Sequence, residues 1–148
     1  SLAEFIAEIK LSATMEAQSR GCLFSASAVD LSLALDADRD LMLAAVGNLL
    51  QNAFKFSRAD GGAASLQASA EGEHILIDVQ DNGPGLSDAA MQALFQPFTQ
   101  AGDDRSGMGL GLTISRRSVE LNGGTLDVRR APDGGCVFTI AMPGHTLR

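Results

Sequence analysis

A chain of 148 residues that is 45% hydrophobic and 20% charged can form one globular domain with a sizeable core, and this composition excludes a disordered segment. The net charge of −7 argues against nucleic acid or an anionic membrane as the partner, because both require a positive protein surface. The sequence contains no apolar run of about 18 residues, so we expect a cytoplasmic domain without direct membrane contact, whether or not its full-length parent is membrane-anchored. Cys22 and Cys136 fall in strand-like stretches, which favours small, reduced core residues over a disulfide.

Helical periodicity predicts two helices in the first half of the chain. Hydrophobic residues recur at helical spacing over residues 2–19, and Gly21 ends this first helix. Two short strands are predicted at 22–25 and 31–35. A second amphipathic helix begins near Asp38, and its buried stripe comprises Met42, Ala45, Val46, Leu49, Leu50 and Ala53.

One face of the second predicted helix is polar. Asn48, Asn52 and Lys55 follow one another at helical spacing, with Phe56 beside them. Asparagine is a mediocre helix former, so two of them one turn apart require a reason. One reason is a solvated outer face. The other is a site in which an amide oxygen binds a hard cation and Lys55 binds a phosphate, and the helix alone does not decide between them.

An acid and a glycine-rich turn end the next predicted hairpin. After a loop at 58–63, strands at 66–70 and 74–80 lead into Asp81-Asn82-Gly83-Pro84-Gly85. These residue types favour a surface turn. The alternative is a ligand site in which Gly83 and Gly85 let the backbone approach a ligand that Asp81 recognises.

A second glycine-rich segment follows a short predicted helix that begins at Ser87. Phe95 and Phe98 bracket a proline and indicate a packed corner. The segment that follows, residues 99–106, is short and polar. Gly107-Met108-Gly109-Leu110-Gly111-Leu112 then opens another helix, where free N–H groups can bind a phosphate. The same glycines are compatible with tight packing on a strand, and their spacing is that of neither a Walker A loop nor a dinucleotide fingerprint.

The C-terminal part is predicted to be two strands. Asn122-Gly123-Gly124 caps the preceding helix, and the strands occupy residues 125–130 and 135–142. His74 is predicted to lie on the surface, at the start of its strand. His145 is predicted to lie in a frayed tail.

Four motifs therefore occur in order: the helix with Asn48 and Asn52, the turn at Asp81, the Phe95–Phe98 pair and the loop at 107–112. In this order they resemble the catalytic ATP-binding domain of bacterial sensor histidine kinases, in the superfamily of gyrase B, heat-shock-90 and mismatch-repair ATPases. The resemblance covers nearly the whole chain and implies a single domain over residues 1–148. The implied fold is an α/β two-layer sandwich. A mixed, largely antiparallel sheet of about five strands is covered on one face by three helices, with the ATP site between helices and lid.

The resemblance implies ATP and Mg²⁺ as cofactors. Asp81 would accept the adenine amino group, directly and through a water, and select adenine over guanine, which has a carbonyl at that position. Asn52 would ligate Mg²⁺, Asn48 would support the phosphate and metal shell, and Lys55 would contact phosphate.

The other implied positions surround the nucleotide. Phe56 would lie beside the base, and Gly83 and Gly85 would hold the turn. Phe95 and Phe98 would anchor the base of a lid, in which Arg105 is an implied phosphate contact. The far hinge and phosphate cradle would comprise Gly107, Gly109, Leu110, Gly111 and Leu112.

Asn48 also separates branches of the superfamily. In the hydrolysing members and the serine-directed kinases, a glutamate usually stands four residues before the metal-binding asparagine and acts as general base. An amide cannot accept a proton from water or a serine hydroxyl, so Asn48 favours transfer to an imidazole, which is a nucleophile when neutral.

The resemblance further implies that the phosphoacceptor lies elsewhere, because neither His74 nor His145 is followed by an acidic residue on a helix. The expected partners are the helical dimerisation domain that carries the acceptor histidine and, indirectly, a response regulator. We expect the chain itself to be monomeric. The alternatives are a regulatory nucleotide-binding module without catalysis, or an ATPase or serine kinase of the same superfamily.

Overall fold

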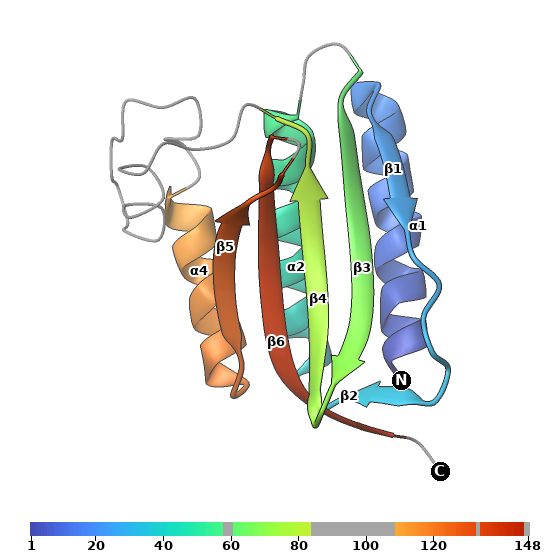
Figure 1. Cartoon of the computed structure of the whole chain (residues 1–148), viewed down its shortest axis with the longest axis vertical. Helices are drawn as coiled ribbons and strands as arrows, with labels where there is room; N and C mark the ends of the chain where they lie inside the picture. Colours follow the sequence, from blue (N-terminus) through green and yellow to red (C-terminus); the bar gives the residue numbers. More distant parts are fainter. Residues whose placement is uncertain (58–60, 84–108, 133, 147–148) are drawn as a thin grey trace.

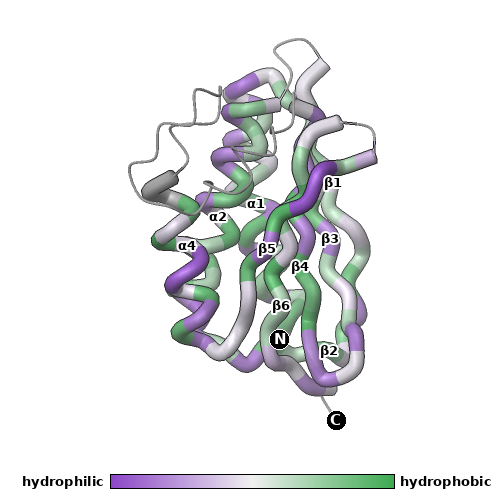
Figure 2. Tube along the Cα trace, turned by 60° about the vertical axis from the view of Figure 1, so that its left-hand side comes forward, coloured by the Kyte–Doolittle hydropathy of each residue, from purple (hydrophilic) through white to green (hydrophobic). Residues whose placement is uncertain are grey.

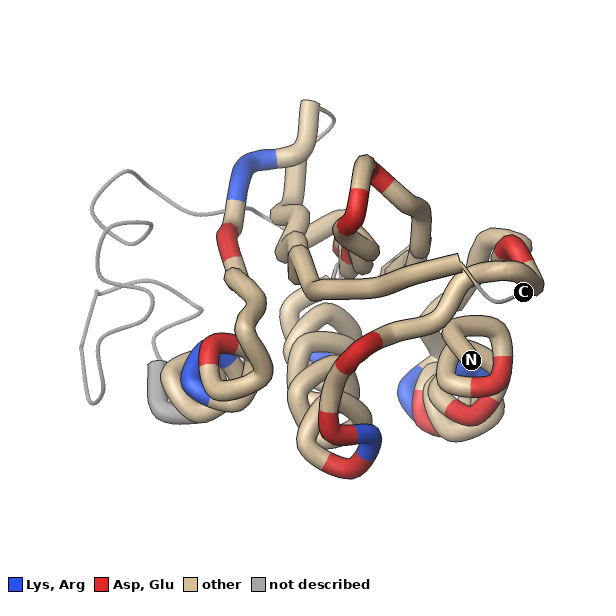
Figure 3. The backbone as a smooth tube through the Cα atoms, turned by 90° about the horizontal axis from the view of Figure 1, so that it is seen from below, with Lys and Arg blue, Asp and Glu red and all other residues tan. Residues whose placement is uncertain are grey.

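The computed structural model describes residues 1–57, 61–83, 109–132 and 134–146. These residues form a twisted sheet with helices on one of its faces (Figure 1). The described helices are α1 (Leu2–Arg20), α2 (Arg39–Phe56) and α4 (Gly109–Leu121), which lie side by side beneath the sheet (Figure 3). The described strands are β1 (Leu23–Ala26), β2 (Leu33–Leu35), β3 (Ala63–Glu71), β4 (His74–Asp81), β5 (Thr125–Arg130) and β6 (Cys136–Thr146). The predicted two-layer sandwich is confirmed.

The sheet is mixed and largely antiparallel, as predicted. Its strand order is β1-β3-β4-β6-β2, with β5 pairing β6 off this path. Among the described pairs, β1–β3 is parallel and the others are antiparallel. The long strand β6 pairs β4 through residues 137–143, β5 through 136–141 and β2 through 144–146. It therefore links the β3–β4 hairpin to β5 and to β2.

The helix boundaries follow the local signals in the sequence. Gly21 ends α1 in a left-handed conformation with φ of 68°, which glycine adopts without a steric penalty. Asp38 caps α2, because its carboxylate accepts a hydrogen bond from the amide of Leu41. The predicted apolar stripe of α2 is buried at all its positions. Helix α1 therefore starts and ends within about a residue of its predicted limits, and α2 starts within about a residue of its predicted start.

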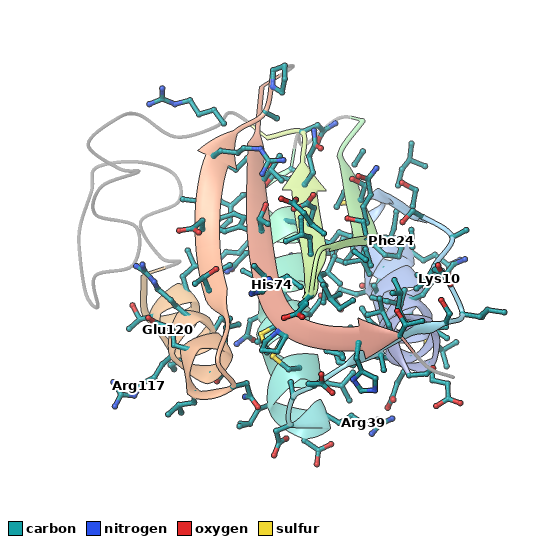
Figure 4. All side chains as sticks on the ribbon, turned by 60° about the horizontal axis from the view of Figure 1, so that its bottom comes forward. Lys10, Phe24, Arg39, His74, Arg117 and Glu120 are labelled. Carbon is teal, nitrogen blue, oxygen red and sulfur yellow. The ribbon has the colours of Figure 1, made fainter. Side chains whose placement is uncertain are left out.

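The core lies between the sheet and the helices, and hydrophobic segments concentrate in the central strands and along the inner helix faces (Figure 2). Charged side chains on the helices point outward, as the labelled Lys10, Arg39, Arg117 and Glu120 do (Figure 4). Cys136 is buried in β6 and Cys22 is half-buried before β1, and these two cysteines do not form a disulfide. None of the described helices is long and apolar enough to cross a membrane.

The prediction for His145 is wrong. Strand β6 continues past Met142, and His145 pairs with Ala34 of β2. Its ring also contacts the carboxylate of Asp36, with Nδ1 2.8 Å from Oδ1. Pro143 and Gly144 are local signals for the end of a strand, but pairing with β2 overrides them. By contrast, His74 lies exposed at the start of β4, as predicted (Figure 4).

Candidate functional site

The topology brings three of the sequence motifs to one end of the domain. In Figure 1, α2 and β4 both end toward the top of the molecule, and the upper end of helix α4 is its N-terminus. Helices α2 and α4 pack against each other, and β4 lies over α2. Residues near the C-terminal ends of α2 and β4 therefore face the same region as the N-terminus of α4.

Asp81 is buried because of the alternation along β4. Ile75, Ile77 and Val79 point into the core, and the same two-residue period places Asp81 on the core face, with 2% of its surface exposed. A buried carboxylate is costly unless it is hydrogen-bonded. Its Oδ1 accepts a hydrogen bond from the amide of Gly83 at 2.9 Å, which sets the orientation of the carboxylate at the end of the strand. The structure thus rejects the surface-turn interpretation for Asp81.

Asn82 holds the chain that follows Asp81, a role the sequence did not suggest. Its Oδ1 accepts from the amide of Ala63 at 3.0 Å, and its Nδ2 donates to the carbonyl of Gly61 at 2.9 Å. Its own amide donates to the carbonyl of Ala63 at 3.2 Å. Asn82 therefore fastens the turn to the start of β3 while Asp81 points into the core. The asparagine–glycine pair after an acid is the signal that could have indicated it.

Asn48 is linked to α4 by Ser115, a second residue whose role the sequence did not suggest. Its Nδ2 donates to the hydroxyl of Ser115 at 3.4 Å, and that hydroxyl donates to the carbonyl of Ala45 at 3.5 Å. Ser115 has no exposed surface. With Nδ2 as the donor, Oδ1 is the Asn48 atom that can accept a hydrogen bond or ligate a cation. Ser115 shares the buried face of α4 with Leu112 and Val119, so a polar residue at helical spacing was the available signal.

The remaining motif residues of α2 are more accessible. Asn52 and Phe56 are half-buried, whereas Lys55 is exposed. The Nζ of Lys55 lies 5.2 Å from the centre of the Phe56 ring, within the range of a cation–π contact. The polar face predicted for α2 is thus an accessible amide and a cation in the last turns of the helix, beside the end of β4.

Helix α4 begins within the glycine-rich motif. Gly109, Leu110 and Gly111 form its first residues, and Leu112 is fully buried. The first amides of a helix have no partner within the helix and carry the positive end of its dipole, so this end suits an anion. Five predicted site positions lie outside the described residues: Gly85, Phe95, Phe98, Arg105 and Gly107.

A separate cavity of about 250 Å³ lies between α1 and α2. Ile9, Leu50, Phe54, Glu8 and Glu16 are among its lining residues. None of the predicted site residues that the structure describes lines it. This cavity is therefore distinct from the region formed by the ends of α2, β4 and α4.

Comparison with known proteins identifies the family of the chain. Residues 37–146 match the family described as histidine kinase-, DNA gyrase B-, and HSP90-like ATPase. The chain is 38% identical over 121 residues to the sensor protein TorS of Escherichia coli (strain K12), covering 82% of this chain and 13% of TorS. It is 38% identical over 109 residues to the alginate biosynthesis sensor protein KinB of Pseudomonas aeruginosa, covering 74% of this chain and 18% of KinB. The chain thus spans less than a fifth of the length of these relatives.

Solved structures share the fold. The catalytic domain of the histidine kinase ThkA superposes with a TM-score of 0.82 at 23% identity, covering 96% of this chain and 91% of that domain. Full-length ShkA, solved in complex with AMPPNP, superposes with a TM-score of 0.83 at 24% identity, covering 99% of this chain and 30% of ShkA. The chain therefore belongs to the histidine kinase-, DNA gyrase B- and HSP90-like ATPase family.

Proposed function

We propose that this domain binds ATP with Mg²⁺ and donates the γ-phosphate to a histidine on a separate helical domain of the same kinase. The observation that carries the proposal is the position of buried Asp81 at the end of β4, toward the end of the domain where α2 ends and α4 begins. In a nucleotide site, an acid that recognises the base and a helix N-terminus that binds the phosphates lie at opposite ends of the bound nucleotide. The family to which the chain belongs consists of ATP-binding domains, which supports this assignment.

Asp81 is proposed to read the base. Its Oδ1 is oriented by the amide of Gly83, so the carboxylate can accept a hydrogen bond from the amino group of adenine. Guanine presents a carbonyl at that position, and two acceptors would then face each other with no proton between them. An unmatched buried acceptor costs free energy, so the site favours adenine.

The phosphates and Mg²⁺ are proposed to lie between α2 and the start of α4. Mg²⁺ would be held by the half-buried Asn52 amide oxygen and by phosphate oxygens, because a hard cation prefers oxygen ligands. Bound Mg²⁺ would neutralise charge on the phosphates. Asn48, held by Ser115, would support this shell, and Lys55 would contact a phosphate from the end of α2.

Asn48 supports a histidine as the acceptor. An amide has no basic site for the proton of a serine hydroxyl or of water, so this position cannot provide a general base. A neutral imidazole has no such requirement, and positioning with charge neutralisation then suffices for transfer. Asn48 also weighs against the alternative of an ATPase or a serine kinase.

The partners follow from the relatives, whose sensor proteins are much longer than this chain. ThkA has been solved in complex with the response regulator protein TrrA. For this chain we propose a helical dimerisation domain as the direct partner and a response regulator as the indirect one.

The test is to mix this chain with its separately expressed acceptor domain and γ-labelled ATP. The expected product carries the label on histidine, and Asn52→Ala, which removes the proposed metal ligand, should not form it. Nucleotide binding without any labelled histidine would contradict the proposal and favour a regulatory nucleotide-sensing module instead.

A further inference from the structure

The turn between β5 and β6 packs directly on the backbone of Asp81. Gly134 and Gly135 both have a positive φ, of 94° and 79°. Residues other than glycine rarely adopt this backbone conformation. A Cβ added to Gly135 would lie 2.9 Å from the carbonyl carbon of Asp81, 3.0 Å from Oδ1 and closer still to the Asp81 carbonyl oxygen. Gly135 thus approaches the main chain and the carboxylate of Asp81 at once.

The pairing of the strands explains why this contact matters. The β4–β6 ladder ends at the pair Gln80–Val137, whereas β3 continues to pair with Asp81 through Ala64. Strand β4 therefore no longer pairs with β6 beyond Gln80, and the β5–β6 turn lies against the β6 side of Asp81. The turn is held by its own hydrogen bonds, from Gly134 N to Ala131 O and from Ala131 N to Gly135 O, both at 3.1 Å.

We propose that Gly135 is a positioning residue for base recognition, because its bare backbone lets the Asp81 carboxylate sit against the β5–β6 turn. This inference rests on the proposed role of Asp81 in reading adenine. A side chain at position 135 forces the Asp81 backbone to move, because the nearest atoms are main-chain atoms with little freedom in a packed interior. The Oδ1–Gly83 hydrogen bond that aims the carboxylate moves with it. A small displacement of the Asp81 carboxylate should reduce the selectivity for adenine more than it reduces the stability of the fold.

Two other glycines provide matched controls in the turn between α4 and β5, at the opposite end of β5 (Figure 1). A Cβ on Gly124 would lie 2.5 Å from the carbonyl oxygen of Ala141, so Gly124→Ala reproduces the backbone clash. Gly123 has φ of 82° and its nearest neighbour, Pro143 Cγ, is at 3.6 Å, so Gly123→Ala reproduces the backbone strain without the clash. Neither glycine contacts Asp81.

The experiment measures the dissociation constants of ATP and GTP by calorimetry in the presence of Mg²⁺, for the wild type and for each alanine variant of this chain. Gly135→Ala should lower the preference for ATP over GTP by about tenfold or more. Gly123→Ala and Gly124→Ala should keep the wild-type preference even though thermal unfolding shows that they are less stable. A folded Gly135→Ala variant with the wild-type preference would overturn the positioning role.

Two further results separate this inference from the function on which it rests. If Asp81→Asn keeps the wild-type preference, the base-reading role and the positioning role both fail. If Asp81→Asn loses the preference and Gly135→Ala keeps it, only the positioning role fails. Should Gly135→Ala not fold, the amide resonances of the wild-type chain decide: ATP must shift Gly135 together with Gly83. A shift of Gly83 alone would overturn the inference.

Discussion

Asn48 of α2 donates a hydrogen bond to Ser115 of α4, and Ser115 donates to the carbonyl of Ala45 one turn earlier on α2. A single buried hydroxyl therefore connects the helix that carries the proposed metal ligand to the helix that opens the proposed phosphate site. Both contacts are long, at 3.4 and 3.5 Å, so each is weak by itself. Their value lies in fixing which way the Asn48 amide faces.

Ser115→Ala should lower the free energy of unfolding by about 1 kcal/mol, because the half-buried amide of Asn48 loses its acceptor. Urea denaturation measures this change. The variant should also transfer phosphate more slowly than the wild type while binding adenosine with unchanged affinity, because Asp81 is untouched. Ser118→Ala is the control on the same helix. If Ser115→Ala and Ser118→Ala slow transfer equally, Ser115 does not orient Asn48.

Asp81→Asn should weaken ATP binding by about 1–3 kcal/mol, because the amide can present a donor to the adenine amino group. Calorimetry measures the loss. Asp78→Asn is a matched control, since it makes the same charge change on β4 but lies on the opposite face of the sheet, where Asp78 accepts from Thr139. It should leave the ATP affinity unchanged. Equal losses in the two variants would point to net charge and not to base recognition.

The sequence could predict what depends on local periodicity. The alternation Ile75, Ile77, Val79 extends to Asp81, so the strand pattern contains the signal for the burial of this acid, although the turn residues that follow favoured a surface position. The stripe of α2 and the glycine at the end of α1 were predictable for the same reason, because each depends on residues a few positions apart. The roles of the site residues came from the resemblance to a family, not from these patterns.

Contacts between distant segments could not be predicted. Asn48 and Ser115 are 67 positions apart, and no local pattern relates them. Gly135 is predicted as the first residue of the last strand, whereas β6 begins at Cys136, and the approach of Gly135 to Asp81 depends on how β4 and β6 pair. His145 is predicted to lie in a frayed tail near the end of the sequence, whereas β2 pairs with that part of β6. In each case tertiary packing, and not local propensity, decides the outcome.

Asn52→Ala should lose the Mg²⁺ dependence of ATP binding before it loses selectivity for adenine. The half-buried amide lies on the proposed phosphate side, whereas Asp81 remains to read the base. The measurement is ATP affinity with Mg²⁺ and with a chelator. Gln51→Ala removes an exposed amide from the adjacent position of α2 and should behave as the wild type. A variant Asn52→Ala that still responds to Mg²⁺ as the wild type does would exclude Asn52 as the ligand.

Asn122→Ala should destabilise the domain by about 1–2 kcal/mol, because Asn122 joins α4 to the start of α2. Its Oδ1 accepts from the amide of Asp38 at 2.8 Å, and its Nδ2 donates to the carbonyl of Ser118 at 2.9 Å. Asn122→Asp keeps the acceptor for Asp38 and loses only the donor to Ser118, so it should retain part of the stability. Urea denaturation of both variants separates the two bonds. If both variants lose the same free energy, the contact with Ser118 accounts for the effect and the link between the helices does not.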